Sequence, residues 1–306
     1  MSSLTGRDVL TLADLTREEV ESVLALAADL KRGARTLHCP KTLGLIFTKS
    51  STRTRISFSQ AMYRLGGQVL DLNPTVTQVG RGEPVQDTAR VLSRYLDVLA
   101  IRTFAQSEIE TYARYADIPV INALTDDYHP CQILADLQTM QEVFGQLAGL
   151  TLTYLGDGNN VAHSLLLGCA HAGVNVRIAT PANFEPRADI VARAKELSGG
   201  RSSVEVLRDP VAAVRGAHVL YTDVWASMGQ ESEADDRIPV FMPYQINDRL
   251  LREAESNAIV LHCLPAHRDE EITEAVLEGS QSRVWDQAEN RLHAQQALLA
   301  LVLGIA

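Results

Sequence analysis

FTKSSTRTRISF, residues 47–58, marks the junction between a predicted strand and a predicted helix. The apolar run 43–47 leading into it predicts a buried strand. Ser50, Ser51 and Thr52 then offer side chains suited to capping the start of a helix. The helix is predicted by apolar residues at helical spacing before a glycine pair: Phe58, Ala61, Met62, Leu65, then Gly66 and Gly67.

Two arginines, Arg53 and Arg55, fall in the first turn of this helix. Backbone N–H groups and the helix dipole favour anions at that end. Cations there are unfavourable on dipole grounds alone, and a bound anion would explain them. The stretch lacks the glycine-rich pattern of a P-loop, which leaves hydroxyl and guanidinium groups to hold the anion. A phosphate site is one interpretation, and a capped helix with solvated arginines is the other.

Strand and helix patterns alternate along the rest of the chain. This alternation predicts the α/β class, with two doubly wound parallel-sheet α/β domains joined by interdomain helices. We expect domains at 1–145 and 146–288, a joining helix at 131–144, and a C-terminal helix at 289–303. The segment from Ser227 to about Tyr244 is expected to be irregular. Strands are predicted at 43–47, 68–72, 97–102, 118–122, 151–155, 174–179, 204–207, 218–222 and 258–262, and further helices at 17–32, 52–65, 85–96, 106–116, 160–172, 187–197, 210–215, 246–255 and 272–278.

Composition limits the possible partners. The 306 residues carry a net charge of −10 and are 46% hydrophobic, which argues against nucleic acid or an anionic membrane as partner. No run reaches transmembrane length, and the start is not of the signal-peptide type. The four cysteines show no CxxC pairing, which indicates a reducing compartment and predicts a cytoplasmic protein.

Several polar residues follow predicted strands, where ligands bind in open α/β sheets. Arg102 is expected either to pair with a core carboxylate or to face an anion. His129 precedes Pro130 at a helix start and taken alone indicates packing or capping. Asp223 follows an apolar strand, and a turn cap is its alternative role. The polar loop 75–84 is either plain surface or a segment that reaches a ligand through Gln78 or Arg81.

Two cofactor interpretations have weak support. The turn LGDGNNVAHS follows a strand, but Val161 occupies the third glycine position and the next strand lacks the acidic residue of a nicotinamide site. Asn159 and Asn160 could instead bond a polar ligand. A thiol nucleophile at Cys263 would need a base, and His262, its neighbour on a strand, points to the opposite face. Zinc ligands are conceivable, but their spacing matches no usual zinc pattern: His129, Cys131, His262, Cys263 and His267.

Four motifs occur in order along the chain: S-T-R-T at 51–54, H-P-C-Q at 129–132, D-x-W-x-S-M-G at 223–229 and H-C-L-P at 262–265. With them the chain resembles the ornithine carbamoyltransferases of the aspartate/ornithine carbamoyltransferase family over essentially its full length. The first two motifs suit any transcarbamoylase, whereas the last two form the ornithine-type pair. The resemblance implies transfer of a carbamoyl group from carbamoyl phosphate to L-ornithine. A nicotinamide dehydrogenase and an inactive relative are the alternatives.

The resemblance also implies roles for single residues. Residues 1–145 with the C-terminal helix would form the carbamoyl-phosphate-binding domain, and 146–288 the ornithine-binding domain. No metal or organic cofactor is expected. The protein would be a cytoplasmic homotrimer, or a higher assembly of that trimer, in arginine biosynthesis, with arginine breakdown as the alternative role. Carbamoyl phosphate would be bound by Ser51, Thr52, Arg53, Thr54, Arg102, His129, Pro130, Cys131, Gln132, Cys263, Leu264 and Arg291, with Gln78 from a neighbouring subunit. L-Ornithine would be bound by Asn160, Asp223, Ser227 and Met228. The catalytic residues would be Arg102, His129, Asp223 and Cys263.

Overall fold

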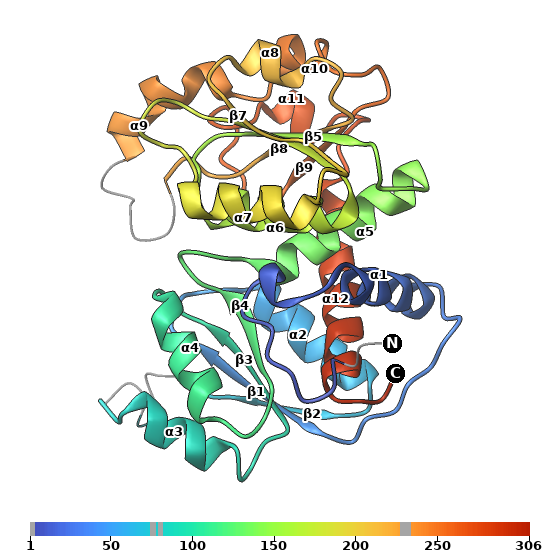
Figure 1. Cartoon of the computed structure of the whole chain (residues 1–306), viewed down its shortest axis with the longest axis vertical. Helices are drawn as coiled ribbons and strands as arrows, with labels where there is room; N and C mark the ends of the chain where they lie inside the picture. Colours follow the sequence, from blue (N-terminus) through green and yellow to red (C-terminus); the bar gives the residue numbers. More distant parts are fainter. Residues whose placement is uncertain (1–3, 74–77, 79–81, 227–233) are drawn as a thin grey trace. The chain divides into compact units, whose positions relative to one another are not determined.

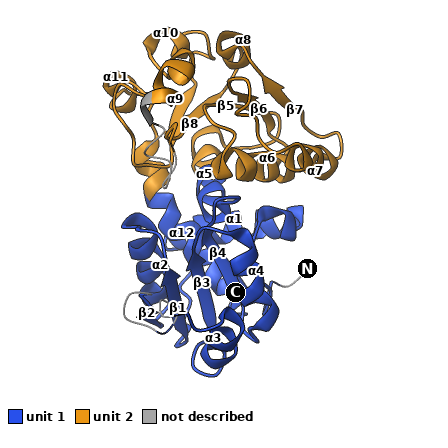
Figure 2. Cartoon of the chain, turned by 90° about the vertical axis from the view of Figure 1, so that its left-hand side faces the viewer, with its two compact units in different colours: residues 1–138, 289–306 blue, residues 139–288 orange. Residues whose placement is uncertain are grey.

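The protein is represented by a computed structural model, which describes residues 4–73, 78, 82–226 and 234–306. The chain divides into two compact units, 1–138 with 289–306 and 139–288 (Figure 1, Figure 2). Both divisions fall inside helices, α5 (Pro130–Phe144) and α12 (Val284–Val302). Among the described helices, none has both the length and the apolar character needed to cross a membrane.

Unit 1 is built on a four-stranded sheet of order β2-β1-β3-β4 in which every paired strand is parallel. Helices α3 and α4 cover one face and α2 covers the other (Figure 2). The side chains between the sheet and α3 and α4 form an apolar core that includes Ile46, Leu99 and Tyr112. The elements of this unit are η1 (Leu12–Asp14), α1 (Arg17–Lys31), β1 (Thr42–Phe47), α2 (Arg53–Arg64), β2 (Gln68–Asp71), α3 (Val85–Leu92), β3 (Val98–Arg102), α4 (Gln106–Tyr115) and β4 (Val120–Leu124).

Unit 2 carries a five-stranded parallel sheet of order β7-β6-β5-β8-β9. Helices α6 and α7 lie on one face, and α8, α10 and α11 lie on the other (Figure 1). The predicted α/β class with two doubly wound parallel sheets is confirmed. Its elements are β5 (Thr151–Leu155), α6 (Asn160–Ala172), β6 (Asn175–Ala179), α7 (Ala188–Ser198), β7 (Val204–Leu207), α8 (Pro210–Val214), β8 (Val219–Thr222), α9 (Ala234–Phe241), η4 (Met242–Tyr244), α10 (Asp248–Leu251), β9 (Ile259–His262) and α11 (Glu274–Leu277).

The strand order fixes where each unit can hold a ligand. In unit 1 the chain winds from β1 to β2 and then crosses to β3 on the other side of β1. In unit 2 it winds outward from β5 to β7 and then crosses to β8 on the other side of β5. Loops that leave such neighbouring strands in opposite directions open a crevice at their carboxyl ends, which is where α/β sheets bind ligands. The chain therefore has two such places, one at β1/β3 and one at β5/β8.

The start of α2 differs in detail from the prediction. Thr52 occupies the cap position but makes no side-chain cap bond, and the Ser51 hydroxyl instead accepts from the Thr54 N–H at 3.3 Å. The predicted apolar face of this helix is fully buried, with Phe58, Ala61 and Met62 at 0% exposure. Of the three candidate cap residues, Ser51 is thus the one that bonds the helix start.

Three predicted segments in the C-terminal half were wrong. The supposedly irregular region contains α9, where Pro239 and a polar sequence conceal the helix signal. Helix α10 is four residues long and begins at Asp248, since the Ile246 N–H donates to the Glu271 carbonyl and Ile246 does not open the helix. Helix α12 begins at Val284 rather than at about 289. The sequence did not predict its first turn because Trp285, which is 55% exposed, interrupts the apolar periodicity there.

Candidate active site

At the switch point of unit 1, a buried guanidinium joins α12 to α2 and α5. Arg291 is 5% exposed and donates from Nη1 to Gln132 Oε1 at 2.6 Å and from Nη2 to Thr54 Oγ1 at 3.1 Å. Gln132 in turn donates from Nε2 to Asp136 Oδ1 at 2.8 Å. Arg291 lies well inside α12 and is buried, although its charge alone would suggest a solvent-exposed residue.

The His129 side chain lies just before α5 and is 5% exposed. Burial lowers its pKa well below the ordinary value, and the positive charges of Arg291, Arg102 and Arg53 lower that pKa further. Its imidazole is therefore neutral near pH 7 and keeps one N–H donor and one acceptor nitrogen. A neutral donor among three guanidinium groups suits a ligand that carries negative charge.

The two arginines of the first α2 turn have different surroundings. Arg55 forms an ion pair with Asp71 and lies over the Phe47 ring at 4.9 Å from its centroid. Arg53 is exposed, and no carboxylate of the described chain forms an ion pair with it. The nearby Lys49 is 5% exposed and pairs with Asp126. Arg53 is thus the cation of this stretch that lacks a carboxylate, which favours the phosphate interpretation over solvated arginines.

Two further predicted residues of unit 1, Cys131 and Gln78, lie in opposite surroundings: the first is buried and the second is exposed. The Cys131 thiol is fully buried and donates to the Asn122 carbonyl at 3.4 Å. Burial raises its pKa to about 12, so it stays a thiol and holds the start of α5 against β4. Gln78 is exposed, and its carbonyl accepts from the Glu83 N–H at 3.3 Å. Pro130, next to Cys131, opens α5 and is buried.

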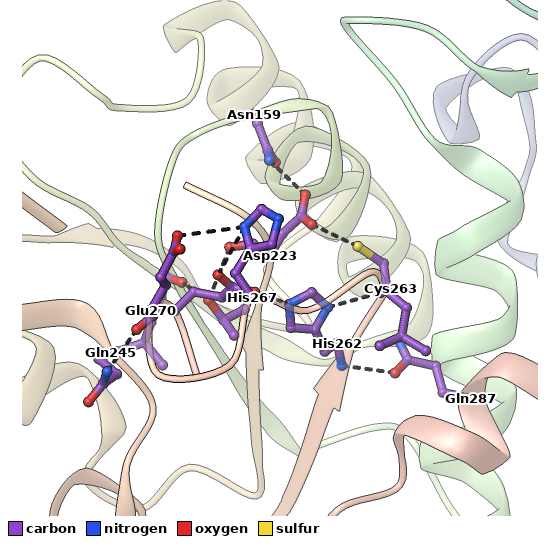
Figure 3. A network of polar contacts seen from close by, with 12 residues as sticks. Asn159, Asp223, Gln245, His262, Cys263, His267, Glu270 and Gln287 are labelled. Atoms are coloured by element: carbon purple, nitrogen blue, oxygen red, sulfur yellow. Dashed lines mark hydrogen bonds and ion pairs between the residues drawn. The ribbon is translucent and has the colours of Figure 1, made fainter. Parts of the chain in front are cut away.

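At the switch point of unit 2, the Asp223 carboxylate follows β8 and is 7% exposed. Its Oδ2 accepts from Asn159 Nδ2 at 2.9 Å, and its Oδ1 accepts from the Cys263 thiol at 2.9 Å (Figure 3). The structure thus brings together residues from the ends of β5, β8 and β9. Asn160, half-buried, opens α6 one residue after Asn159. Ser227 and Met228 lie outside the described residues.

Asn159 is a residue whose contact with Asp223 the sequence did not predict. Its Oδ1 accepts from the Val161 and Ala162 N–H groups at the start of α6, and from Tyr154 Oη at 3.3 Å. Burial, followed by the charge of Asp223, raises the Tyr154 pKa well above its usual value, so the phenol remains a donor. With three donors on its oxygen, the amide must present Nδ2 to Asp223.

The turn after β9 is held by a buried histidine. His262 Nε2 lies 2.8 Å from Glu271 Oε1, and its Nδ1 accepts from the Leu264 N–H at 2.9 Å (Figure 3). Nδ1 therefore carries no proton, and Nε2 donates to the carboxylate. This contact fixes Leu264, whose φ of 59° is unusual for a residue with a side chain. His262 holds the turn that presents Cys263 and Leu264, and its ring nitrogens do not bond the thiol.

Gly158, the second glycine of the turn after β5, has a packing role. A Cβ built there would lie 2.2 Å from Pro186 N and 2.4 Å from the Glu185 carbonyl carbon. The glycine is needed because residues 184–186 cross directly over the turn, and Gly158 N–H donates to the Phe184 carbonyl at 2.8 Å. The close approach of residues 184–186 thus accounts for this glycine without a bound phosphate.

Comparison with known proteins gives matches for both units. Residues 7–142 match the family model of the aspartate/ornithine carbamoyltransferase carbamoyl-P binding domain, and 148–302 match that of the Asp/Orn binding domain. Ornithine carbamoyltransferases of Synechococcus elongatus and Thermosynechococcus vestitus are 73% and 70% identical, each alignment covering at least 98% of both chains. Solved ornithine carbamoyltransferases of Gloeobacter violaceus (57% identity, TM-score 0.89) and Pyrococcus furiosus (49%, 0.95) also cover at least 98% of each chain.

The burial of neutral His129 predicts a pH effect on stability. The unfolded chain protonates this imidazole below about pH 6.5, whereas the folded chain, with its lowered pKa, resists protonation. The contribution of neutral His129 to the free energy of unfolding is therefore fully present above about pH 6.5. Below that pH it falls by up to about 1.4 kcal/mol per pH unit. Denaturant unfolding of wild type and His129→Asn at several pH values should show a smaller acid loss in the variant. Parallel profiles would contradict a buried neutral His129.

Proposed function

The chain belongs to the aspartate/ornithine carbamoyltransferase family, and from this premise we propose which of its residues carry the reaction. It transfers the carbamoyl group of carbamoyl phosphate to the side-chain amine of L-ornithine, which gives L-citrulline and phosphate. The amine forms a bond to the carbonyl carbon, the bond from that carbon to the phosphate oxygen breaks, and phosphate leaves. The burial of His129 among the charges of Arg291, Arg102 and Arg53, which lowers its pKa, is the feature that supports these roles most strongly.

In our proposal, unit 1 binds carbamoyl phosphate. Arg53 and the hydroxyl and N–H groups of residues 51–54 take the phosphate, because a guanidinium fork matches phosphate oxygens and a helix start favours anions. Arg102, His129 and Gln132 take the carbamoyl end. Arg291 reaches the same place, since it already bonds Thr54 and Gln132. Cys131 and Pro130 contribute by positioning His129 and Gln132 rather than through side-chain contact.

Stabilisation of charge on the carbonyl oxygen is the main catalytic contribution we assign. Attack of the amine places negative charge on that oxygen, and donors aimed at it stabilise the transition state. The neutral imidazole of His129 and the guanidinium of Arg102 are suitable donors. Loss of one such donor typically raises the barrier by about 3–4 kcal/mol. A neutral imidazole also leaves the net positive charge to the arginines, which bind the dianionic substrate.

Unit 2, in the same proposal, binds L-ornithine. Asp223 pairs with the α-ammonium group, with Asn160 and the segment of Ser227 and Met228 completing the contacts. The amine that attacks must be neutral, although such an amine has an ordinary pKa of about 10.4. Nearby guanidinium groups favour its neutral form, and the leaving phosphate accepts the proton released on attack. Cys263 and Leu264 line the reacting centre, where the thiol is held by Asp223.

We further propose a cytoplasmic homotrimer that acts in arginine biosynthesis. Cytoplasmic location is supported by the cysteines, which form no disulfide among the described residues. A trimer would let Gln78 of one chain reach the phosphate of the next, as the resemblance implies. The reaction as proposed uses side chains and backbone N–H groups of the chain together with the two substrates, and it requires no organic cofactor or metal.

Arg53 and Arg55 form a matched pair for testing the phosphate assignment. Arg53→Ala should lower kcat/KM roughly thirty-fold to several thousand-fold, because a charged contact to phosphate is lost. Arg55→Ala removes the same charge from the same turn, but the contacts it loses are the ion pair to Asp71 and the Phe47 ring, so activity should remain. Carbamoyl phosphate should raise the Tm of wild type and Arg55→Ala but not of Arg53→Ala. Equal thermal shifts in all three proteins would refute the assignment.

Asn159 should act as a positioning residue for ornithine. Asn159→Asp keeps the oxygen that caps α6 but removes the donor to Asp223 and adds a like charge. The kcat/KM for ornithine should fall at least about thirty-fold, as when a buried charge loses its partner, while carbamoyl phosphate affinity stays constant. Asp209→Ala, which removes the cap of α8, is the control: it should cost about 1 kcal/mol of stability and leave ornithine kinetics unchanged. Equal kinetics in the two variants would make Asn159 a cap only.

If Gln78 of one chain completes the phosphate site of its neighbour, two variants that are each defective should complement one another in a mixed assembly. Arg53→Ala and Gln78→Ala proteins should each have only a small residual activity. Dissociating and reassembling them together should restore full activity at roughly a quarter of the sites, by random assortment in a cyclic assembly. The restored site combines Arg53 from one chain with Gln78 from its neighbour. A mixture as inactive as its two components would show that each chain completes its own site.

A further inference from the structure

A second polar cluster follows β9 and plays no part in the proposed reaction. His267 Nδ1 lies 3.6 Å from Glu270 Oε2 and 3.9 Å from Glu271 Oε2. One potential ligand atom from each of the three residues lies within 4.8 Å of the other two. The His267 and Glu270 side chains, which lie side by side in Figure 3, are 51% and 42% exposed, whereas that of Glu271 is 0% exposed. The cluster therefore opens to solvent above one buried carboxylate.

The buried carboxylate of Glu271 has one oxygen engaged and one oxygen left over. Oε1 accepts from His262 Nε2 at 2.8 Å and from the His267 N–H at 2.7 Å. Within the part of the chain that the structure describes, no donor makes a hydrogen bond to Oε2. Burying such an oxygen without a donor is unfavourable, and more so when the group is charged. Oε2 lies 3.9 Å from His267 Nδ1, a distance too long for a hydrogen bond.

We propose that His267, Glu270 and Glu271 bind a divalent transition-metal ion, with Zn²⁺ as the best match. A tetrahedral zinc ion with bonds of about 2.0–2.2 Å places its ligand atoms roughly 3.3–3.6 Å apart. The observed separations of 3.6 and 3.9 Å reach this range after small movements of the two exposed side chains. The ion takes one nitrogen and two carboxylate oxygens, and water fills the remaining position. The ion gives the buried Glu271 Oε2, which accepts no hydrogen bond from the described residues, a positive partner.

The ligand set selects the class of ion. Imidazole nitrogen suits zinc, copper and nickel, whereas magnesium requires near-octahedral oxygen coordination and retains most of its water. A protonated His267 that merely pairs with both carboxylates is the competing explanation. Both explanations place positive charge at Oε2, and only one of them needs an ion.

The proposed site is separate from a second group that could ligate metal, formed by Asp223, His262 and Cys263. A thiolate at Cys263 would attract zinc strongly enough to mask binding elsewhere. The Cys263→Ser chain therefore serves as the background for every binding measurement. Because binding rather than turnover is measured, failure of this proposal is distinguishable from failure of the catalytic assignments.

Calorimetric titration of Zn²⁺ into the folded Cys263→Ser protein tests the proposal. We expect one ion per chain, bound at least about tenfold more weakly when His267→Asn or Glu270→Gln is added. Glu278→Gln is the matched control, since Glu278 pairs with Arg268 nearby and carries the same charge. It should leave zinc affinity unchanged. Bound Co²⁺ should give a visible d–d spectrum without a thiolate charge-transfer band, and excess Mg²⁺ should not displace it.

Two outcomes would overturn the proposal. Absence of zinc binding in the Cys263→Ser protein would leave the protonated His267 ion pair as the explanation. Equal zinc affinity in the Glu270→Gln and Glu278→Gln proteins would place the ion elsewhere. Melting temperatures of all variants verify that each is folded, and the two exposed ligands, His267 and Glu270, are expected to be replaceable without unfolding.

Discussion

The buried guanidinium of Arg291 is the contact on which unit 1 depends. It links α12 to Thr54 of α2 and Gln132 of α5, and its charge lowers the pKa of His129. A buried arginine is tolerated only when its donors find acceptors, and here those acceptors are residues of the proposed substrate site. Substrate binding and folding of this unit therefore draw on the same side chains. In unit 2, Asp223 has the corresponding place, since its two oxygens join the ends of three strands.

Much of the fold could be predicted from local sequence. Buried parallel strands such as β1 and β5 read as short apolar runs, and helices such as α1 and α6 carry clear caps and periodicity. The predictions were wrong where local signals are weak. Pro239 conceals α9, and polar or exposed residues conceal the beginning of α12. The buried face of α2 was predictable, whereas the choice of Ser51 as cap depends on the path of the chain before the helix.

The site was less predictable than the fold, because its contacts join distant positions. Arg291 lies 237 residues from Thr54, and Asn159 lies 64 residues from Asp223. Spacing along the chain says nothing about such pairs. Motif resemblance named Asn160 but did not reveal the Asn159 contact, for which the only sequence signal is an asparagine suited to capping α6. Likewise, Arg55 and Arg53 look alike in sequence, and only the position of Asp71 distinguishes them.

The division of the chain inside α5 and α12 affects the order in which it can fold during synthesis. Unit 2 is a continuous segment, 139–288, whereas unit 1 needs its last eighteen residues, 289–306. Domains of a nascent chain fold as units, generally from the N-terminus, once all their residues have emerged. Here that order is reversed: the second unit is complete while the first still lacks Arg291. A ribosome that stalls before residue 289 would release a chain with an intact unit 2 and an open, unfinished unit 1.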